Sequence, residues 1–141
     1  MNEAPRVDRL PVSRLRAPAL IGLGAAAAFT ALRLRDPHTE GSWGFCPFLA
    51  MTGRPCPGCG GLRAVNDLTH GDVIGAISSN ALAVALVVVL AAAWVIWVVR
   101  ALRGSSDPMI QLGHRTGLLV IGLIAVFGVV RNLPFGTWLA P

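Results

Sequence analysis

Residues 81–99 read ALAVALVVVLAAAWVIWVV, an unbroken run of 19 apolar residues without a charge. At a rise of about 1.5 Å per residue, such a helix reaches about 28 Å, close to the roughly 30 Å hydrocarbon core of a bilayer. Trp94 and Trp97 stand near its end and Arg100 follows, an arrangement typical of a membrane–water interface. The run therefore predicts a membrane-spanning helix, which we place at residues 78–100.

Two shorter apolar blocks flank this run and predict further spans at residues 17–34 and 113–131. Arg16 and Arg33 bound the first block and can extend toward head groups, which compensates for its modest length. A cleaved signal peptide is the alternative for this block, but no small-residue cleavage site follows it. The chain is expected to cross the membrane three times.

The composition agrees with lipid as the main surroundings of this chain of 141 residues. Hydrophobic residues make up 54% and charged residues 13%, against about a quarter charged in soluble domains. All 12 basic residues are arginines, placed in ones and twos beside the apolar blocks. Nucleic-acid-binding proteins instead gather such residues on one face, so nucleic acid is not an expected partner. We expect a flexible basic tail over residues 1–16 and a single polytopic membrane domain over residues 17–141.

Orientation follows from the distribution of these arginines. With the N-terminus inside, seven lie in inner and five in outer segments, which favours a cytoplasmic N-terminus in a multi-pass plasma-membrane protein. Three short helices enclose little volume, so self-association or binding to other membrane proteins is expected.

The segment between the first two spans is rich in proline and glycine, which predicts a structured loop rather than a long helix. Residues 62–70 can form a short interfacial helix that ends at Gly71, and Asp72 can cap the next helix. Arg63 and Asp67 are spaced for an ion pair on one face of the short helix. The expected fold class is all-α, with three transmembrane helices and a Cys/Pro/Gly-rich loop and short helix between the first two.

All three cysteines of the protein, Cys46, Cys56 and Cys59, lie within 14 residues of this loop. In Cys56-Pro57-Gly58-Cys59-Gly60 two thiolates can face one ion, while the glycines permit positive φ and let backbone N–H groups approach the sulfurs. A structural zinc site needs four ligands, and we predict Cys46, Cys56, Cys59 and His70. Zinc is the only cofactor that the sequence suggests.

Two other interpretations of the cysteines stay open. They can form a thiol–disulfide redox pair, because the short helix that starts after Cys59 and the charge of Arg63 would favour a thiolate. They can also be small loop residues without chemistry. A transporter or channel subunit that depends on Asp72 or Asn80 is a third class of function. No arrangement of residues known from enzymes occurs in the sequence, so an enzyme is not predicted.

The run CPFLAMTGRPCPGCGGLRAVNDLTHGDVIGAISSN resembles the signature of a bacterial membrane family, domain-of-unknown-function family 2752. The resemblance covers roughly residues 45–135. It rests on these positions: Cys46, Pro47, Thr52, Gly53, Cys56, Pro57, Gly58, Cys59, Gly60, Arg63, Ala64, Gly71, Asp72, Asn80 and the pair Arg131-Asn132.

Two positions depart from that signature. Leu62 replaces a frequent threonine, and Ala81 replaces a frequent proline, which predicts that the second span begins without a kink. The resemblance implies a polytopic membrane protein and brings no known activity. We therefore expect an accessory or structural membrane component with a metal-binding loop.

Overall fold

A computed structural model describes residues 11–39, 41–43, 45–104, 113–136 and 138. Five helices and no strand occur in these ranges, which confirms the all-α class. The helices are α1 (Pro11–Leu34), α2 (Pro47–Thr52), α3 (Gly61–His70), α4 (Val73–Leu102) and α5 (His114–Val130). Residues 1–10 of the predicted flexible tail lie outside the described residues.

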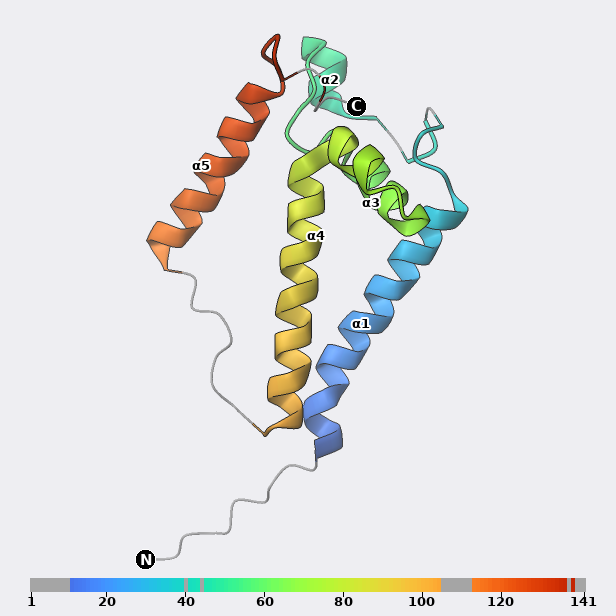
Figure 1. Ribbon diagram of the computed structural model, residues 1–141, viewed down its shortest axis with the longest axis vertical. Helices are drawn as coiled ribbons and strands as arrows, with labels where there is room; N and C mark the ends of the chain where they lie inside the picture. Colours follow the sequence, from blue (N-terminus) through green and yellow to red (C-terminus); the bar gives the residue numbers. More distant parts are fainter. Residues whose placement is uncertain (1–10, 40, 44, 105–112, 137, 139–141) are drawn as a thin grey trace, which may run out of the picture.

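The three long helices alternate in direction along the molecule (Figure 1). α1 and α4 are long and apolar enough to cross a membrane, and little of their most apolar stretch is buried. An apolar helix of a soluble protein would be covered by its own fold, so these helices fit a membrane protein. α5 is also apolar, but with 17 residues, about 25 Å at the usual rise, it is shorter than these two candidate spans.

Helix α1 begins earlier than the sequence predicts. It starts at Pro11, so residues 11–16, which we expected in the flexible tail, are helical. Proline at the first helical position is favourable because its missing N–H has no helical partner there. The arginines at this end stay exposed at Arg14 and Arg16, so they do not prevent the helix from extending beyond its apolar part.

Helices α1 and α4 contact each other through a tryptophan seated on a glycine. The indole Nε1 of Trp94 donates to the Pro18 carbonyl at 2.9 Å. A Cβ on Gly22 would approach the Trp94 ring to 2.8 Å, so only glycine leaves room for it. Trp94, expected in an interfacial belt, thus also joins two helices. Arg14 adds a bond from its guanidinium to the Gly104 carbonyl at 2.9 Å, across the same end of the pair.

The corner between α3 and α4 carries the caps that the sequence predicts. Gly71 ends α3 with φ of 82°, and the Asp72 carboxylate accepts from the Gly75 N–H at 2.8 Å at the start of α4. The prediction that α4 begins without a kink is wrong. Asn80 has φ of −167° and ψ of 97°, well outside the helical range.

The cause of the kink is the side chain of Asn80, not a proline. Its Oδ1 accepts the Ala83 N–H at 2.9 Å, as an N-cap residue does. The part of α4 after Asn80 therefore behaves as a separately capped helix, about 33 Å long, and corresponds to the predicted span. The short part before it runs beside α3.

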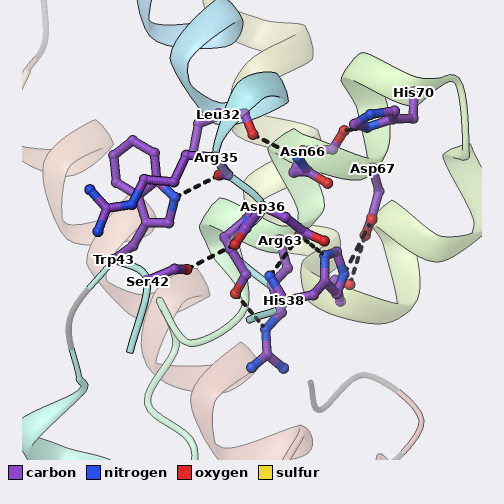
Figure 2. Close-up of polar contacts among 12 residues, drawn as sticks. Leu32, Arg35, Asp36, His38, Ser42, Trp43, Arg63, Asn66, Asp67 and His70 are labelled. Atoms are coloured by element: carbon purple, nitrogen blue, oxygen red, sulfur yellow. Dashed lines mark hydrogen bonds and ion pairs between the residues drawn. The ribbon is translucent and has the colours of Figure 1, made fainter. Parts of the chain in front are cut away.

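The α1–α2 loop, described at residues 35–39, 41–43 and 45, folds onto α3 (Figure 2). His38 lies between two carboxylates, with Nδ1 2.8 Å from Asp36 and Nε2 3.3 Å from Asp67. The prediction of an Arg63–Asp67 ion pair is wrong, because each side chain binds a different partner. Arg63 Nε donates to the Pro37 carbonyl at 3.3 Å, and Asp67 accepts from the Ser79 hydroxyl at 2.9 Å.

Two further bonds tie the end of α1 to α3. The buried amide of Asn66 donates to the Leu32 carbonyl at 2.7 Å, and the Arg33 guanidinium donates to the Thr69 carbonyl. These carbonyls belong to the last turns of α1 and α3, where no intrahelical donor is available. The α1 end, the α1–α2 loop and α3 therefore form one polar layer at one end of the long helices.

Candidate metal centre

The three cysteines come together at that same end from two local structures. Cys46 directly precedes α2 in an extended conformation, and Pro47 occupies the first helical position. Cys56 and Cys59 belong to a turn in which the Cys59 N–H donates to the Cys56 carbonyl at 3.0 Å. Gly60 has φ of 77° and lies at the start of α3. We call residues 55–60 the cysteine knuckle.

The sulfur atoms form a compact triangle. Cys56 Sγ lies 3.2 Å from Cys59 Sγ and 3.5 Å from Cys46 Sγ, and all three lie within 4.8 Å of one another. Zinc–sulfur bonds of about 2.3 Å in a tetrahedron separate two sulfurs by about 3.8 Å. The two shorter sulfur–sulfur distances, 3.2 and 3.5 Å, lie slightly below this value and exceed the roughly 2.05 Å of a disulfide bond. The arrangement can therefore accept a soft metal ion with small adjustments.

Side chains from α4 and from the end of α5 hold the peptide groups of the cysteine knuckle. The Asn80 amide donates to the carbonyls of Pro57 and Cys59, each at 2.9 Å. Arg131 donates to the carbonyls of Cys56 at 2.9 Å and Cys59 at 3.0 Å. Asn80 and Arg131 are each only 1% exposed, so these bonds are shielded from water and fix the turn.

A third side chain and a glycine complete this support. Asn132 donates to the Pro55 carbonyl at 3.0 Å and to the Gly128 carbonyl at 2.7 Å. A Cβ on Gly128 would approach the Pro57 ring to 2.7 Å, so the ring lies directly on the backbone of α5. The last turn of α5 is thus joined to the cysteine knuckle by a packing contact as well as by hydrogen bonds.

The structural role of Arg131 and Asn132 was not recognised in the sequence, although the pair was noted as part of the family signature. An arginine directly after an apolar helix is normally an interfacial residue, and nothing in its position indicates burial. The nearest usable signal is the asparagine that follows it, because a second strong donor at a helix end often serves a loop carbonyl. Only the fold shows which loop that is.

The thiols have different acidities for identifiable reasons. The pKa of Cys46 is lowered to about 7, first by the Leu49 backbone N–H at the start of α2 and then by the Cys59 side chain. The pKa of Cys59 is raised to about 12, first by burial and then by hydrogen bonding with the other two thiols. The helix that follows Cys59 therefore does not make this thiol acidic, because burial of the sulfur outweighs the helix dipole.

The prediction that the glycines of the cysteine knuckle adopt positive φ is confirmed at only one of two positions. Gly60 has positive φ, but Gly58 is not among the residues with positive φ. One backbone N–H does approach a sulfur, that of Cys56 at 3.3 Å from Cys59 Sγ. A single left-handed glycine is therefore sufficient to turn the chain from the cysteines into α3.

The fourth predicted ligand, His70, does not lie with the cysteines. It is the last residue of α3, and its Nδ1 is 2.9 Å from the Asn66 carbonyl (Figure 2). The ten residues of α3 separate it from the cysteine knuckle by about 15 Å along the helix. The other nearby histidine, His38, is bound between two carboxylates, those of Asp36 and Asp67. Among the described residues, the group that could hold an ion consists of the three cysteines.

A cavity of about 710 Å³ opens beside the three sulfurs. The α1–α2 loop, α2, the knuckle and the first turn of α3 form its walls. All three cysteines line it together with aromatic and aliphatic side chains and Arg63, whereas Asn80 and Arg131 do not. The cysteines are thus supported by polar bonds from behind the turn and are accessible through the cavity.

The fold and site define an all-helical protein with apolar helices and a three-cysteine cluster at one end. A family model described as a protein of unknown function (DUF2752) matches residues 46–94. This part of the chain is similar to that family, in agreement with the sequence resemblance. The match spans α2, the cysteine knuckle, α3 and most of α4, and it ends before α5. Searches of curated proteins and of solved structures gave no significant match.

Proposed function

We propose that this chain is a small membrane protein, an accessory or structural component, whose cysteine loop binds zinc through Cys46, Cys56 and Cys59. The observation that carries the proposal is the triangle of sulfurs within 4.8 Å, held from behind by buried donors of two helices. Rigid support of the ligands lowers the entropic cost of binding an ion. Bound zinc would in turn stabilise the loop, since binding energy at such a site contributes to folding.

The membrane location rests on the exposed apolar surfaces of α1, α4 and α5. We propose that α1 and α4 span the bilayer and that α5 completes a third, thin crossing, with the interfacial residues at its ends reaching the head groups. The cysteine loop would then lie at one membrane surface, on the side opposite the N-terminus, as the direction of the helices implies (Figure 1).

Metal content is the direct test. The full chain, purified in detergent without chelators or a His-tag, is expected to contain about one zinc per molecule, and Cys56→Ser is expected to lose it. Ser105→Ala, outside the cysteine loop, is a matched control for handling and should retain the metal. Wild-type protein free of metal, with a loop that is equally resistant to proteolysis after chelator treatment, would contradict the proposal.

A thiol–disulfide exchange protein is the second candidate, and the lowered pKa of Cys46 favours it. In this function the Cys46 thiolate attacks a disulfide of a partner, forming a mixed disulfide and releasing one partner thiolate. Cys56 then attacks the Cys46 sulfur, which yields a Cys46–Cys56 disulfide and the fully reduced partner. The sequence suggested Cys56 and Cys59 for this pair, but burial and a raised pKa make Cys59 the less reactive thiol.

This candidate predicts a trapped intermediate. Cys56→Ser should accumulate a mixed disulfide through Cys46, and Cys46→Ser should abolish the trapping. Cys59→Ser keeps both reacting thiols and should therefore trap little mixed disulfide. No observation favours the transport hypothesis in the same way, because Asp72 caps α4 and Asn80 binds the cysteine knuckle.

A further inference from the structure

The geometry of the proposed zinc site leaves one coordination position without a ligand from the described chain. Zinc in proteins is almost always four-coordinate, and structural sites fill all four positions with protein ligands. Here three cysteines form the group, and His38 and His70 are bound elsewhere among the described residues. A site with three protein ligands resembles the open type, in which the fourth position takes an exogenous group.

The cavity shows where such a group would enter. It is lined by all three cysteines, and its volume of about 710 Å³ lies within the range of roughly 300–1,000 Å³ typical of small-ligand pockets. The carbonyl side of the knuckle is occupied by Asn80 and Arg131, which leaves the cavity side for approach. An entering ligand could therefore reach an ion on the sulfurs without moving the supporting side chains.

The lining indicates the chemistry of the ligand. Trp43, Phe45, Leu49 and Leu62 supply apolar walls, and Arg63 supplies a positive charge. Zinc with four thiolates carries two negative charges, and two arginines lie nearby to offset them, Arg131 behind the turn and Arg63 at the cavity. A soft, negatively charged sulfur donor suits both an ion already bound by thiolates and this charge distribution.

We propose that the cavity beside Cys46, Cys56 and Cys59 binds a thiol-bearing ligand whose sulfur becomes the fourth ligand of the metal. Arg63 binds an acidic group on the body of that ligand. The thiol loses its proton to solvent on binding, and no electron transfer takes place. The inference rests on the proposed function, since it requires a metal on the three cysteines.

Cobalt(II) provides the readout, because its absorption reports thiolate ligands and coordination number. The full chain in detergent is loaded with cobalt and titrated with 3-mercaptopropionate. The sulfur-to-cobalt charge-transfer band is expected to rise by about one third as three thiolates become four. Acetate at the same concentration should leave the band unchanged.

Arg63→Gln tests the role of the charge without touching a ligand. The substitution is expected to weaken the binding of 3-mercaptopropionate about three- to fivefold. An effect of this size is typical of the loss of a solvent-accessible ion pair. Binding of 2-mercaptoethanol, which lacks the carboxylate, should be equal in both proteins. Equal weakening of both probes would overturn the assignment of Arg63, since a general disturbance of the cavity would explain it.

The outcomes separate the two proposals. Failure of the chain to bind cobalt through sulfur would reject the metal site itself. Cobalt bound with a spectrum that does not respond to thiols would reject only the open position. A cysteine-containing nonapeptide that binds as tightly as the small thiol would identify a polypeptide as the source of the fourth thiolate ligand.

Discussion

Two segments of the polar end of this protein are fixed by side chains from helices, but by different kinds of contact. The cysteine knuckle is held by buried amide and guanidinium donors that bind its carbonyls, from Asn80, Arg131 and Asn132. The α1–α2 loop is held by more exposed contacts in which His38 meets two carboxylates. Buried hydrogen bonds are costly to break, whereas exposed charge contacts contribute little and respond to pH. The first segment is therefore built for rigidity and the second for adjustment.

Removal of Arg131 is expected to have the largest effect on this contrast. Arg131→Met keeps most of the volume but removes the guanidinium bonds to the Cys56 and Cys59 carbonyls. These carbonyls then keep the Cys59 N–H and the Asn80 amide as donors, and the loss of two charged hydrogen bonds should cost about 3 kcal/mol or more. Zinc content should fall well below one per chain, and the thermal midpoint in detergent should drop. Arg115→Gln, an exposed arginine at the opposite end of α5, is the control. Full metal content in R131M would show that the cysteine knuckle keeps its conformation without the hydrogen bonds from Arg131.

Asn80 should come next, because it serves both the knuckle and α4. Asn80→Ala loses two donor bonds and the cap of the second part of α4, which should cost about 2–3 kcal/mol. Asn80→Asp retains an acceptor for Ala83 but cannot donate to the knuckle. Zinc affinity, measured by competition with a chelator, should be weakened in both variants, and helicity should fall only in Asn80→Ala. Equal helicity in the two would contradict the capping role.

Asn66 provides the corresponding test away from the cysteine knuckle, where α3 contacts the end of α1. Asn66→Ala removes the buried bond to Leu32 and should lower the free energy of unfolding by about 1–2 kcal/mol. The zinc affinity should stay within twofold of wild type, because the bond holds α1 and not the knuckle. Thermal unfolding and chelator competition measure the two quantities on the same sample. Loss of zinc in N66A would mean that the two segments are energetically coupled.

The smallest effect is expected from acid titration of the α1–α2 loop. The pKa of Asp36 is lowered, first by the His38 backbone N–H and then by the His38 side chain. A carboxyl whose folded pKa lies below its unfolded value stabilises the fold above the unfolded pKa of about 3.9. That stability is lost as pH falls through the folded pKa. The difference in unfolding midpoint between wild type and Asp36→Asn should therefore shrink as pH falls below about 4 and disappear below the folded pKa. An unchanged difference there would exclude this contact as its source.

The helical elements could largely be predicted from the sequence. The uncharged run after Asn80 identifies the main span, and Gly71 and Asp72 mark the end of α3 and the start of α4, because caps act through local backbone geometry. The early start of α1 was missed because exposed arginines resemble a tail. The kink in α4 was missed because its cause, the Asn80 side chain, depends on a distant turn.

The candidate site could be predicted only in its sulfur ligands. The crowding of Cys46, Cys56 and Cys59 in one loop already indicates a common role. His70 was a reasonable fourth ligand by composition, yet helix α3 carries it away from the cysteines and its ring binds Asn66. The different acidities of Cys46 and Cys59 also depend on the fold, since burial of Cys59 cannot be judged from neighbours in sequence.

The sequence by itself therefore determined the class of the protein and the place of its chemistry. Long uncharged runs require an apolar environment wherever they lie, and three cysteines within one loop stay close in any fold. The tertiary structure decided what supports that chemistry. Arg131 is separated from Cys56 by 75 residues, and only the return of α5 to the polar end brings its charge beneath the cysteine turn. Contacts over such distances depend on how helices pack, which no local pattern of residues encodes.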